Sequence, residues 1–279
     1  IPGSDLRTAF VPRPGYLLGS VDYSAIELRT LAQTCLDLVG TSELAVAFRN
    51  GKDPHVMLAA VLLNISEAEA EARLAEEDGE GPVTKARQDA KVANFGFPGG
   101  LGIARFIVFA RTTYELHFTE RQASALRERW RARWPEVVAY QKIIASQIDA
   151  AGDALTIVDP RTGFVRGGMG YTDGCNHSFQ ERAAFGAKAA LWEVWSQGAL
   201  HGVYPVAFQH DEIISELPEA TAAEGLEWVS SVMIEEMKRY VPDVPVVTGL
   251  CLMERWYKGA KAVRDATGRL IPWRPKKKG

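Results

Sequence analysis

The spacing of hydrophobic residues changes within the first forty positions of the chain. Residues 16–24 (YLLGSVDYS) form a short apolar run with the character of a strand, and Asp22 lies at its end. Residues 26–39 (IELRTLAQTCLDLV) then repeat their apolar positions with the period of a helix. The pattern therefore predicts an acidic side chain where the first strand gives way to the first helix.

The middle third of the chain, residues 41 to about 150, is predicted to be nearly all helical. Within it, a Glu- and Ala-rich segment at 66–80 has the composition of a solvated helix. Ser66 and Glu69 have the spacing of a capping box at its start, and a Gly-Glu-Gly-Pro sequence follows it. A new helix is expected from residue 83 onward.

The last third returns to strand-like spacing. Two apolar runs are separated only by His210-Asp211, so a tight hairpin is expected to hold Asp211 at its tip. The expected elements are a hairpin over 155–168, a helix over about 178–200, strands over 203–209 and 212–217, a helix near 219–240 and a strand near 245–253. This mixture of segregated strands and helices predicts an α+β fold.

Composition indicates a soluble globular protein. The chain is 47% hydrophobic and 24% charged, and no apolar run approaches the roughly 20 residues of a membrane span. Net charge is only −3, but positive residues gather at 85–91, 127–133 and 274–279. A basic face that binds nucleic acid is thus compatible with the nearly neutral total.

Cysteine use favours a reducing compartment. Cys35, Cys175 and Cys251 are odd in number and far apart, and they form no Cys-x-x-Cys pair. The first residues lack the basic and apolar segments of a secretory signal. We therefore expect a cytoplasmic protein without a structural zinc site or a membrane partner.

Asp22 and Asp211 are the strongest candidates for chemistry. Two carboxylates at the ends of adjacent strands could hold two magnesium ions about 4 Å apart, as phosphoryl transfer requires. Acidic residues at strand ends and turns are more often solvated caps, so each residue taken alone favours that interpretation. Spacing alone does not join them.

A second candidate is a stripe on a helix expected over about 84–97 and ended by Pro98-Gly99-Gly100. Arg87, Lys91 and Phe95 recur at i, i+4 and i+8, so two cations and a ring share one face and could hold a nucleoside triphosphate. A solvated basic stripe with one core aromatic explains the same spacing.

Three further features have ordinary explanations. The glycines at 99–102 lack the Gly-Lys-Ser/Thr ending of a phosphate-binding loop and are interpreted as a helix stop. His55 could contact phosphate or be a surface histidine. The aromatic segment LWEVW (191–195) is expected to pack in the core.

Taken together, the segments resemble family A, bacterial DNA polymerase I-like, DNA polymerases. DYSAIELR (22–29), RQDAKVANFG (87–96) and QHDE (209–212) are similar to the three polymerase motifs, in the same order. AFRNGKDPH (47–55) and NHSFQ (176–180) resemble two further family segments. The resemblance implies a palm of antiparallel sheet and helices over 1–40 and 173–279, interrupted by helical fingers over 41–172.

The resemblance also implies residue roles. The metal ligands would be Asp22, Asp211 and the Tyr23 carbonyl, with Glu212 nearby and Lys91 assisting catalysis. The nucleotide would be bound by Arg87, Lys91, Phe95, His55 and Tyr23, with Glu27 excluding a ribose 2′-hydroxyl. Primer or template would contact Arg29, Asn176, Gln180 and His210. Partners would be primer–template DNA and deoxynucleoside triphosphates, with two Mg²⁺ ions, for which Mn²⁺ can substitute.

The chain departs from the family pattern at three positions. Gly99 stands where the family usually has a Tyr that stacks on the template base, Ala25 replaces a Gln, and Thr172 stands where an Arg is often found. Fidelity and sugar selection are the properties that these changes would affect.

The segment that resembles the family begins inside the palm. The resemblance leads us to expect no thumb or exonuclease domain in this chain, so either it is a fragment or a separate chain supplies them. Without a duplex-gripping thumb, weak DNA retention and low processivity are expected. A bacterial or phage-infected cytoplasm is the expected location.

The leading hypothesis is a magnesium-dependent, template-directed DNA polymerase that releases pyrophosphate. A DNA-binding remnant without turnover and a single-subunit RNA polymerase are the alternatives. Intact Asp22, Asp211, Arg87 and Lys91 argue against the remnant. Glu27 and Phe95 argue against the RNA polymerase, although Gly99 weakens that argument.

Overall fold

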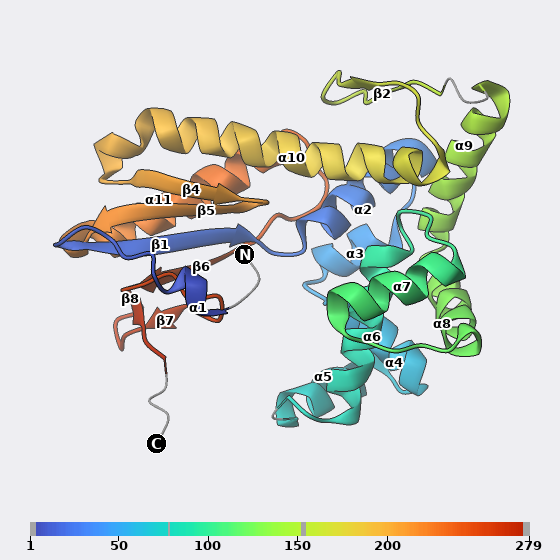
Figure 1. The fold of residues 1–279 in the computed structure, drawn as a ribbon, viewed down its shortest axis with the longest axis horizontal. Coiled ribbons are helices and arrows are strands. Elements are labelled where there is room, and N and C mark those ends of the chain that lie inside the picture. Colours follow the sequence, from blue (N-terminus) through green and yellow to red (C-terminus); the bar gives the residue numbers. More distant parts are fainter. Residues whose placement is uncertain (1–3, 78, 152–154, 276–279) are drawn as a thin grey trace. The chain divides into compact units, whose positions relative to one another are not determined.

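The computed structural model describes residues 4–77, 79–151 and 155–275. The chain folds as two compact units (Figure 1). One, called here the sheet unit, comprises Ile1–Ile26, Arg182–Pro242 and Val246–Gly279; the other, the helical unit, comprises Glu27–Glu181 and Asp243–Pro245. The α+β prediction is confirmed, whereas the palm and fingers boundaries at 40/41 and 172/173 stay predictions.

The sheet unit is built on a sheet with strand order β4-β5-β1-β6-β8-β7. β1 pairs antiparallel with β5 and β6, and β6 pairs parallel with β8. The strands are β1 Tyr16–Tyr23, β4 Tyr204–Gln209, β5 Glu212–Pro218, β6 Thr248–Met253, β7 Val263–Arg264 and β8 Leu270–Trp273. The helices are α1 Ser4–Arg7, the C-terminal part of α10 (Tyr171–Gln197), the 3₁₀ turns Gly198–His201 and Glu219–Thr221, and α11 Ala222–Lys238.

Alternation along β1 separates a packed face of the sheet from a face that carries polar groups. Leu17, Val21 and Tyr23 are buried, and Tyr23 Oη donates to the Met233 carbonyl of α11, so this face packs on α11. Gly19 shares that face, where an added Cβ would come within 2.5 Å of Leu226 in α11. Asp22 lies on the opposite face because side chains alternate along a strand.

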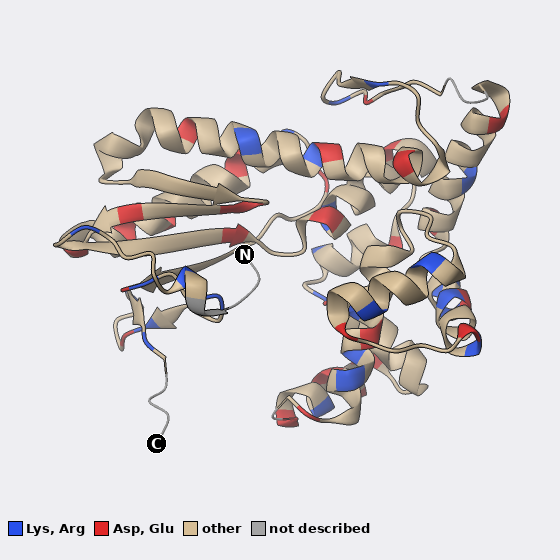
Figure 2. Ribbon diagram, viewed as in Figure 1, with Lys and Arg blue, Asp and Glu red and all other residues tan. Residues whose placement is uncertain are grey.

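The helical unit consists mainly of helices, with a small hairpin. Its elements are α2 Ile26–Val39, α3 Glu43–Arg49, α4 Pro54–Leu63, α5 Glu67–Glu76, α6 Pro82–Gly96, α7 Ile103–Tyr114, α8 Glu120–Arg133, α9 Pro135–Ala151, β2 Ile157–Val158, β3 Val165–Arg166 and the N-terminal part of α10. Basic residues are spread along α6, α7 and α8 (Figure 2). Val56, Ala60, Ala70 and Val83 form a buried cluster that joins α4, α5 and α6.

Most of the expected helices and strands are present, and the main errors concern the residue at which an element begins. The N-cap of α5 is Ser66, whose side chain accepts from the Glu69 amide, and β2 and β3 form the expected hairpin. The helix expected from residue 178 begins at Tyr171, because buried Gly174 fits against Ile144, where an added Cβ would come within 2.8 Å. Strands β7 and β8 were not predicted, and β8 adds a parallel neighbour to β6.

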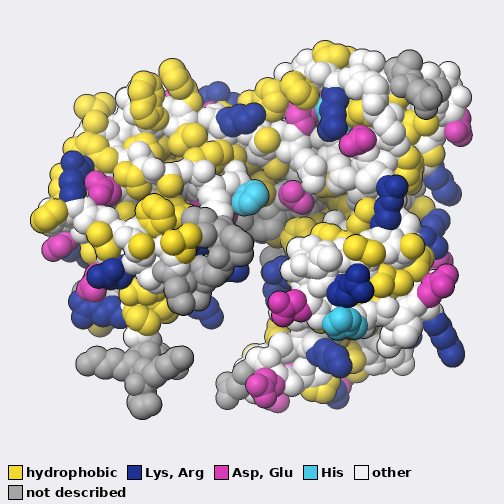
Figure 3. Space-filling model, in the orientation of Figure 1, with side chains coloured by type: hydrophobic (Ala, Val, Ile, Leu, Met, Phe, Trp, Pro, Cys, Tyr) yellow, Lys and Arg dark blue, Asp and Glu magenta, His cyan; other side chains and the backbone are white. Residues whose placement is uncertain are grey.

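The expectation that residues 191–195 pack in the core is wrong for the tryptophans. Helix α10 buries Ala187, Ala190 and Val194, which share one side at helical spacing. Trp192 and Trp195 are 66% and 64% exposed. They line a groove of about 380 Å³ with part of the edge strand β4, and Figure 3 shows hydrophobic side chains at the surface over these elements.

Cys35, Cys175 and Cys251 are all buried and free. Among the described residues, no helix is both long and apolar enough to cross a membrane.

Candidate active site

Asp22 and Asp211 come together at one end of the sheet. Asp22 is opposite Glu212 in the pairing of β1 with β5, and Asp211 immediately precedes Glu212 in the two-residue turn between β4 and β5. His210, the other turn residue, has a left-handed φ of 58°, which allows the tight reversal. The carboxyl groups of Asp22 and Asp211 are hydrogen-bond neighbours.

The electrostatics of the pair follow from this proximity. Although Asp22 is an exposed residue, partial desolvation of its carboxyl group raises its pKa, and the like charges of Asp211 and Glu212 raise it further, to about 7. A proton shared between close carboxylates relieves their repulsion, and a divalent cation would do the same.

Glu212 faces the same side of the sheet as Asp22 but has its own partner. Ser20 Oγ donates to Glu212 Oε1, so the carboxylate of Glu212 is directed toward Ser20 of β1 and away from the turn that holds Asp211. The side chain of Tyr23 points to α11, as shown by its bond to Met233, so only its backbone could join the carboxylates.

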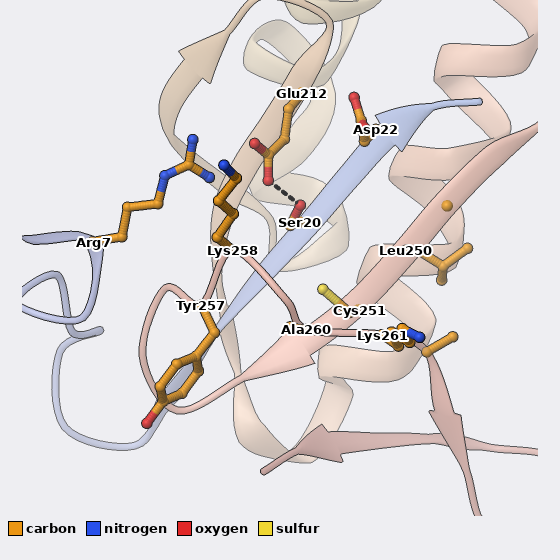
Figure 4. A pocket seen from close by; sticks show the side chains of 12 residues that line it. Arg7, Ser20, Asp22, Glu212, Leu250, Cys251, Tyr257, Lys258, Ala260 and Lys261 are labelled. Carbon is orange, nitrogen blue, oxygen red and sulfur yellow. Dashed lines mark hydrogen bonds between the residues drawn. The ribbon is translucent and has the colours of Figure 1, made fainter. Parts of the chain in front are cut away.

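A cavity of about 500 Å³ opens beside these carboxylates (Figure 4). Asp22, Ser20 and Glu212 line it from the sheet, and three cations, Arg7, Lys258 and Lys261, line it from α1 and from the segment after β6. The cavity therefore carries both signs of charge. Sequence analysis missed these cations, because contacts remote in sequence bring them to the cavity: α1 brings Arg7, and the return of the chain after β6 brings Lys258 and Lys261.

The donor set fits a magnesium site completed by substrate. In the described part of the chain, no three His, Cys, Asp or Glu side chains group closely enough to form a protein-only metal site. Mg²⁺ typically binds one or two carboxylates and completes its octahedron with water and phosphate oxygens. Asp22 is paired with Asp211 and lines the open cavity, which matches that pattern.

The predicted cationic stripe is present in the helical unit. Arg87, Lys91 and Phe95 lie half-buried on α6. His55, at the start of α4, lies beside them, with its ring centroid 5.7 Å from that of Phe95. The interpretation of His55 as a surface histidine is wrong, because it is only 6% exposed.

Arg87 already holds a carboxylate. Its Nε and Nη2 donate to Asp53 Oδ2 at 3.0 and 2.8 Å, and Asp53 Oδ1 accepts from the His55 amide as the N-cap of α4. Burial opposes ionisation of Asp53, but the charge that His55 carries when protonated and the hydrogen bond from Arg87 outweigh burial, so the pKa of Asp53 is lowered. A phosphate arriving at Arg87 would compete with Asp53, which the sequence analysis did not identify.

Two other predicted residues lie in the helical unit. Burial lowers the pKa of Arg29 to about 10; its Nη1 donates to the Pro245 carbonyl and its guanidinium lies 4.2 Å from the centroid of the Phe48 ring. These contacts suit a structural role, and the DNA contact of Arg29 stays a prediction. Glu27 is half-buried, and its charge raises the pKa of Tyr114 after the effect of burial.

Asn176 and Gln180 are one helical turn apart on α10, with Gln180 exposed and Asn176 half-buried. Asn176 Nδ2 donates to the Thr172 carbonyl at 2.9 Å. Gly99 lies directly against this amide, since a Cβ at Gly99 would come within 2.5 Å of Asn176 Nδ2. The missing Tyr of the family pattern thus coincides with space that Asn176 fills.

A methyl group at residue 99 is therefore expected to displace Asn176. Gly99 has no positive φ, so G99A needs no backbone change, and we expect the free energy of unfolding to fall by at most about 1 kcal/mol. Affinity for primer–template DNA is expected to fall several-fold, measured by fluorescence anisotropy. The matched control is G102A, where the added Cβ meets nothing within 4 Å. Equal DNA affinity of both variants would contradict a DNA contact by Asn176.

Comparison with known proteins places the chain among polymerases. Residues 2–258 match DNA polymerase family A. The chain is 28% identical to the thermostable DNA polymerase I of Thermus filiformis and 27% identical to DNA polymerase I of Aquifex aeolicus, over 91% of this chain in each case. The match spans only 28% and 42% of those relatives.

A solved structure shares the fold. The polymerase domain of Pol1 from M. smegmatis, in complex with DNA primer-template and dNTP, superposes with a TM-score of 0.67 over 90% of this chain and 42% of that chain, at 23% sequence identity. The fold, the order of the three sequence segments and the family match over residues 2–258 agree, and the chain belongs to DNA polymerase family A.

Proposed function

We propose that this chain catalyses template-directed transfer of deoxynucleotides to a primer 3′-hydroxyl. The observation that carries the proposal is the pairing of Asp22 and Asp211 in the sheet unit, remote in sequence and adjacent in space. Family A membership supports it, and the related Pol1 domain was solved with DNA primer-template and dNTP.

In this proposal, the carboxylates and the Tyr23 carbonyl hold the divalent metal. Two bound Mg²⁺ ions would supply activation of the primer hydroxyl and charge stabilisation of the leaving pyrophosphate. Asp22 and Asp211 would fix that chemistry at the end of β1, and Glu212 would keep the neighbouring strand end in place through Ser20.

The cationic face of α6 would bind the triphosphate. Arg87, after release from Asp53, would offer a planar pair of donors, and Lys91 would add a point charge that can also supply a proton to the leaving group. His55 would donate a further hydrogen bond, and Phe95 would cover the sugar. Glu27 would exclude ribonucleotides.

A further set of polar and charged residues would contact the primer and the template. Asn176, Gln180 and His210 are proposed DNA contacts, and the cations of the cavity, Arg7, Lys258 and Lys261, are proposed contacts of primer-strand phosphates. Binding of this kind depends on phosphates and weakens with salt.

A primer-extension assay tests the proposal. With magnesium and a labelled primer–template, we expect template-matched addition of deoxynucleotides and little addition of ribonucleotides. Firm DNA binding without extension, even when the N-terminal part of a family relative is added in trans, would indicate the non-catalytic remnant. Preferential ribonucleotide addition would indicate an RNA polymerase.

A further inference from the structure

Asn94 lies at the centre of a buried hydrogen-bond network in the helical unit. Its Oδ1 accepts from Nε1 of Trp130 and from Nε1 of Trp134, both at 3.1 Å. Its Nδ2 lies 3.3 Å from the Pro54 carbonyl and 3.0 Å from Nδ1 of His55. Asn94, Trp130 and Trp134 are each at most 2% exposed.

The orientation of this amide is fixed by its partners. An indole N–H only donates, so the atom that faces both tryptophans must be the amide oxygen. A reversed amide would set NH₂ against two donors and its oxygen against the Pro54 carbonyl, leaving buried groups unpaired. The NH₂ group therefore faces His55.

The amide in turn fixes the proton of His55. Because Asn94 Nδ2 is a donor, His55 Nδ1 must accept, and the neutral ring carries its proton on Nε2. Protonation of Nδ1 would set donor against donor. Burial lowers the pKa of His55 to about 4; Asp53 opposes that shift, and the charges of Arg87 and Lys91 add to it.

The other ring nitrogen remains available. Within the described residues, Nε2 of His55 has no hydrogen-bond partner, and it is not among the buried polar atoms that lack one. His55 adjoins Phe95, and its pKa is influenced by Arg87 and Lys91, so the Nε2–H group belongs to the cationic face.

We propose that Asn94, held by Trp130 and Trp134, is a positioning residue that keeps His55 as the Nε2–H tautomer, so that this neutral ring donates a hydrogen bond to a phosphate oxygen of the incoming nucleotide. The phosphate contact rests on the proposed polymerase function. The tautomer does not, since it follows from the hydrogen-bond chemistry of the free protein.

The tautomer can be read directly from the free protein. In long-range ¹H–¹⁵N spectra of histidine-labelled protein, with H55Q assigning the signal among the five histidines, we expect the Nε2–H pattern for His55 and no protonation between pH 8 and pH 6. The Nδ1–H pattern, or titration near pH 6.5, would overturn the proposal.

N94D tests the positioning role, because a carboxylate still accepts from the tryptophans but now attracts a proton to His55 Nδ1. We expect the pKa of His55 to rise toward neutrality. Above that pKa the neutral ring should keep its proton on Nδ1, so Nε2 would no longer donate to the phosphate. The KM for dATP in primer extension with magnesium should therefore increase about tenfold as pH rises through that pKa. The wild-type KM should stay flat over the same range.

Should N94D fail to fold, the double variant W130F/W134F removes the donors that orient the amide, and a mixed tautomer population is expected. W256F changes another buried tryptophan, which lies outside the network; this variant is the control and should leave the His55 signal unchanged.

A flat KM profile in a folded N94D would overturn the phosphate contact while leaving the polymerase proposal intact. An Nε2–H tautomer in a wild-type protein that neither binds dATP nor extends primers would overturn both the polymerase proposal and the phosphate contact.

Discussion

D22N and D211N should each reduce primer extension in magnesium by about 10³-fold or more, because each removes one of the two carboxylates proposed to hold the metal. The loss should fall on kcat rather than on the KM for dATP, since the triphosphate is proposed to bind the helical unit. The double variant should be little worse than either single variant, because residues that act as one unit are not additive.

Stability separates this loss of catalysis from misfolding. In metal-free protein the raised pKa of Asp22 means that the contribution of this carboxyl group to stability is fully present below pH 3.8 and is lost as pH rises through about 7. D211N removes the main like charge, so at pH 8 it should melt no lower than wild type. Mg²⁺ should raise the melting temperature of wild type and not of D22N or D211N.

The control for this experiment is E235Q. Glu235 is an exposed residue on α11, the helix that packs on the face of the sheet opposite Asp22, and its ion-pair partner among the described residues is the nearby Lys238. Extension by E235Q should match wild type. Comparable losses in E235Q and D211N would contradict a specific role for the carboxylate pair.

R87A and K91A should each lower kcat/KM for dATP by about 10² to 10³, because each removes a cation proposed to face the transferring phosphates. R87A should act mostly on KM, since Arg87 makes a planar contact with bound phosphate, and K91A mostly on kcat, if Lys91 protonates the leaving group. Steady-state extension of one template base, with dATP varied, measures both constants.

K85A is the matched control for the cationic stripe. Lys85 is exposed on the same helix but lies off the stripe formed by Arg87, Lys91 and Phe95. Primer–template affinity should be nearly equal in all three variants, because the proposed DNA contacts lie elsewhere. A K85A effect as large as that of K91A would indicate general charge attraction instead of a nucleotide site.

The sequence predicted those features of the site that depend on local order. The strand ending at Asp22, the turn holding Asp211 and the helical stripe of Arg87, Lys91 and Phe95 each follow from the spacing of nearby residues. The family resemblance predicted which of these belong together. Local spacing could not, because nothing in it specifies that β1 pairs with β5.

The features that were missed depend on contacts remote in sequence. Asp53 binds Arg87 across 34 positions, and Asn94 meets Trp134 across 40. Likewise, the exposed tryptophans of α10 could not be placed from composition, because an aromatic segment looks the same whether its helix faces a core or solvent.

Manganese binding to the free protein tests the central claim most directly. Titrations of Mn²⁺ followed by electron paramagnetic resonance should show binding by wild type that D22N and D211N each weaken about as much as the double variant does, as a shared site requires. Undiminished binding in either single variant, or losses that simply add, would mean that Asp22 and Asp211 do not hold one metal centre.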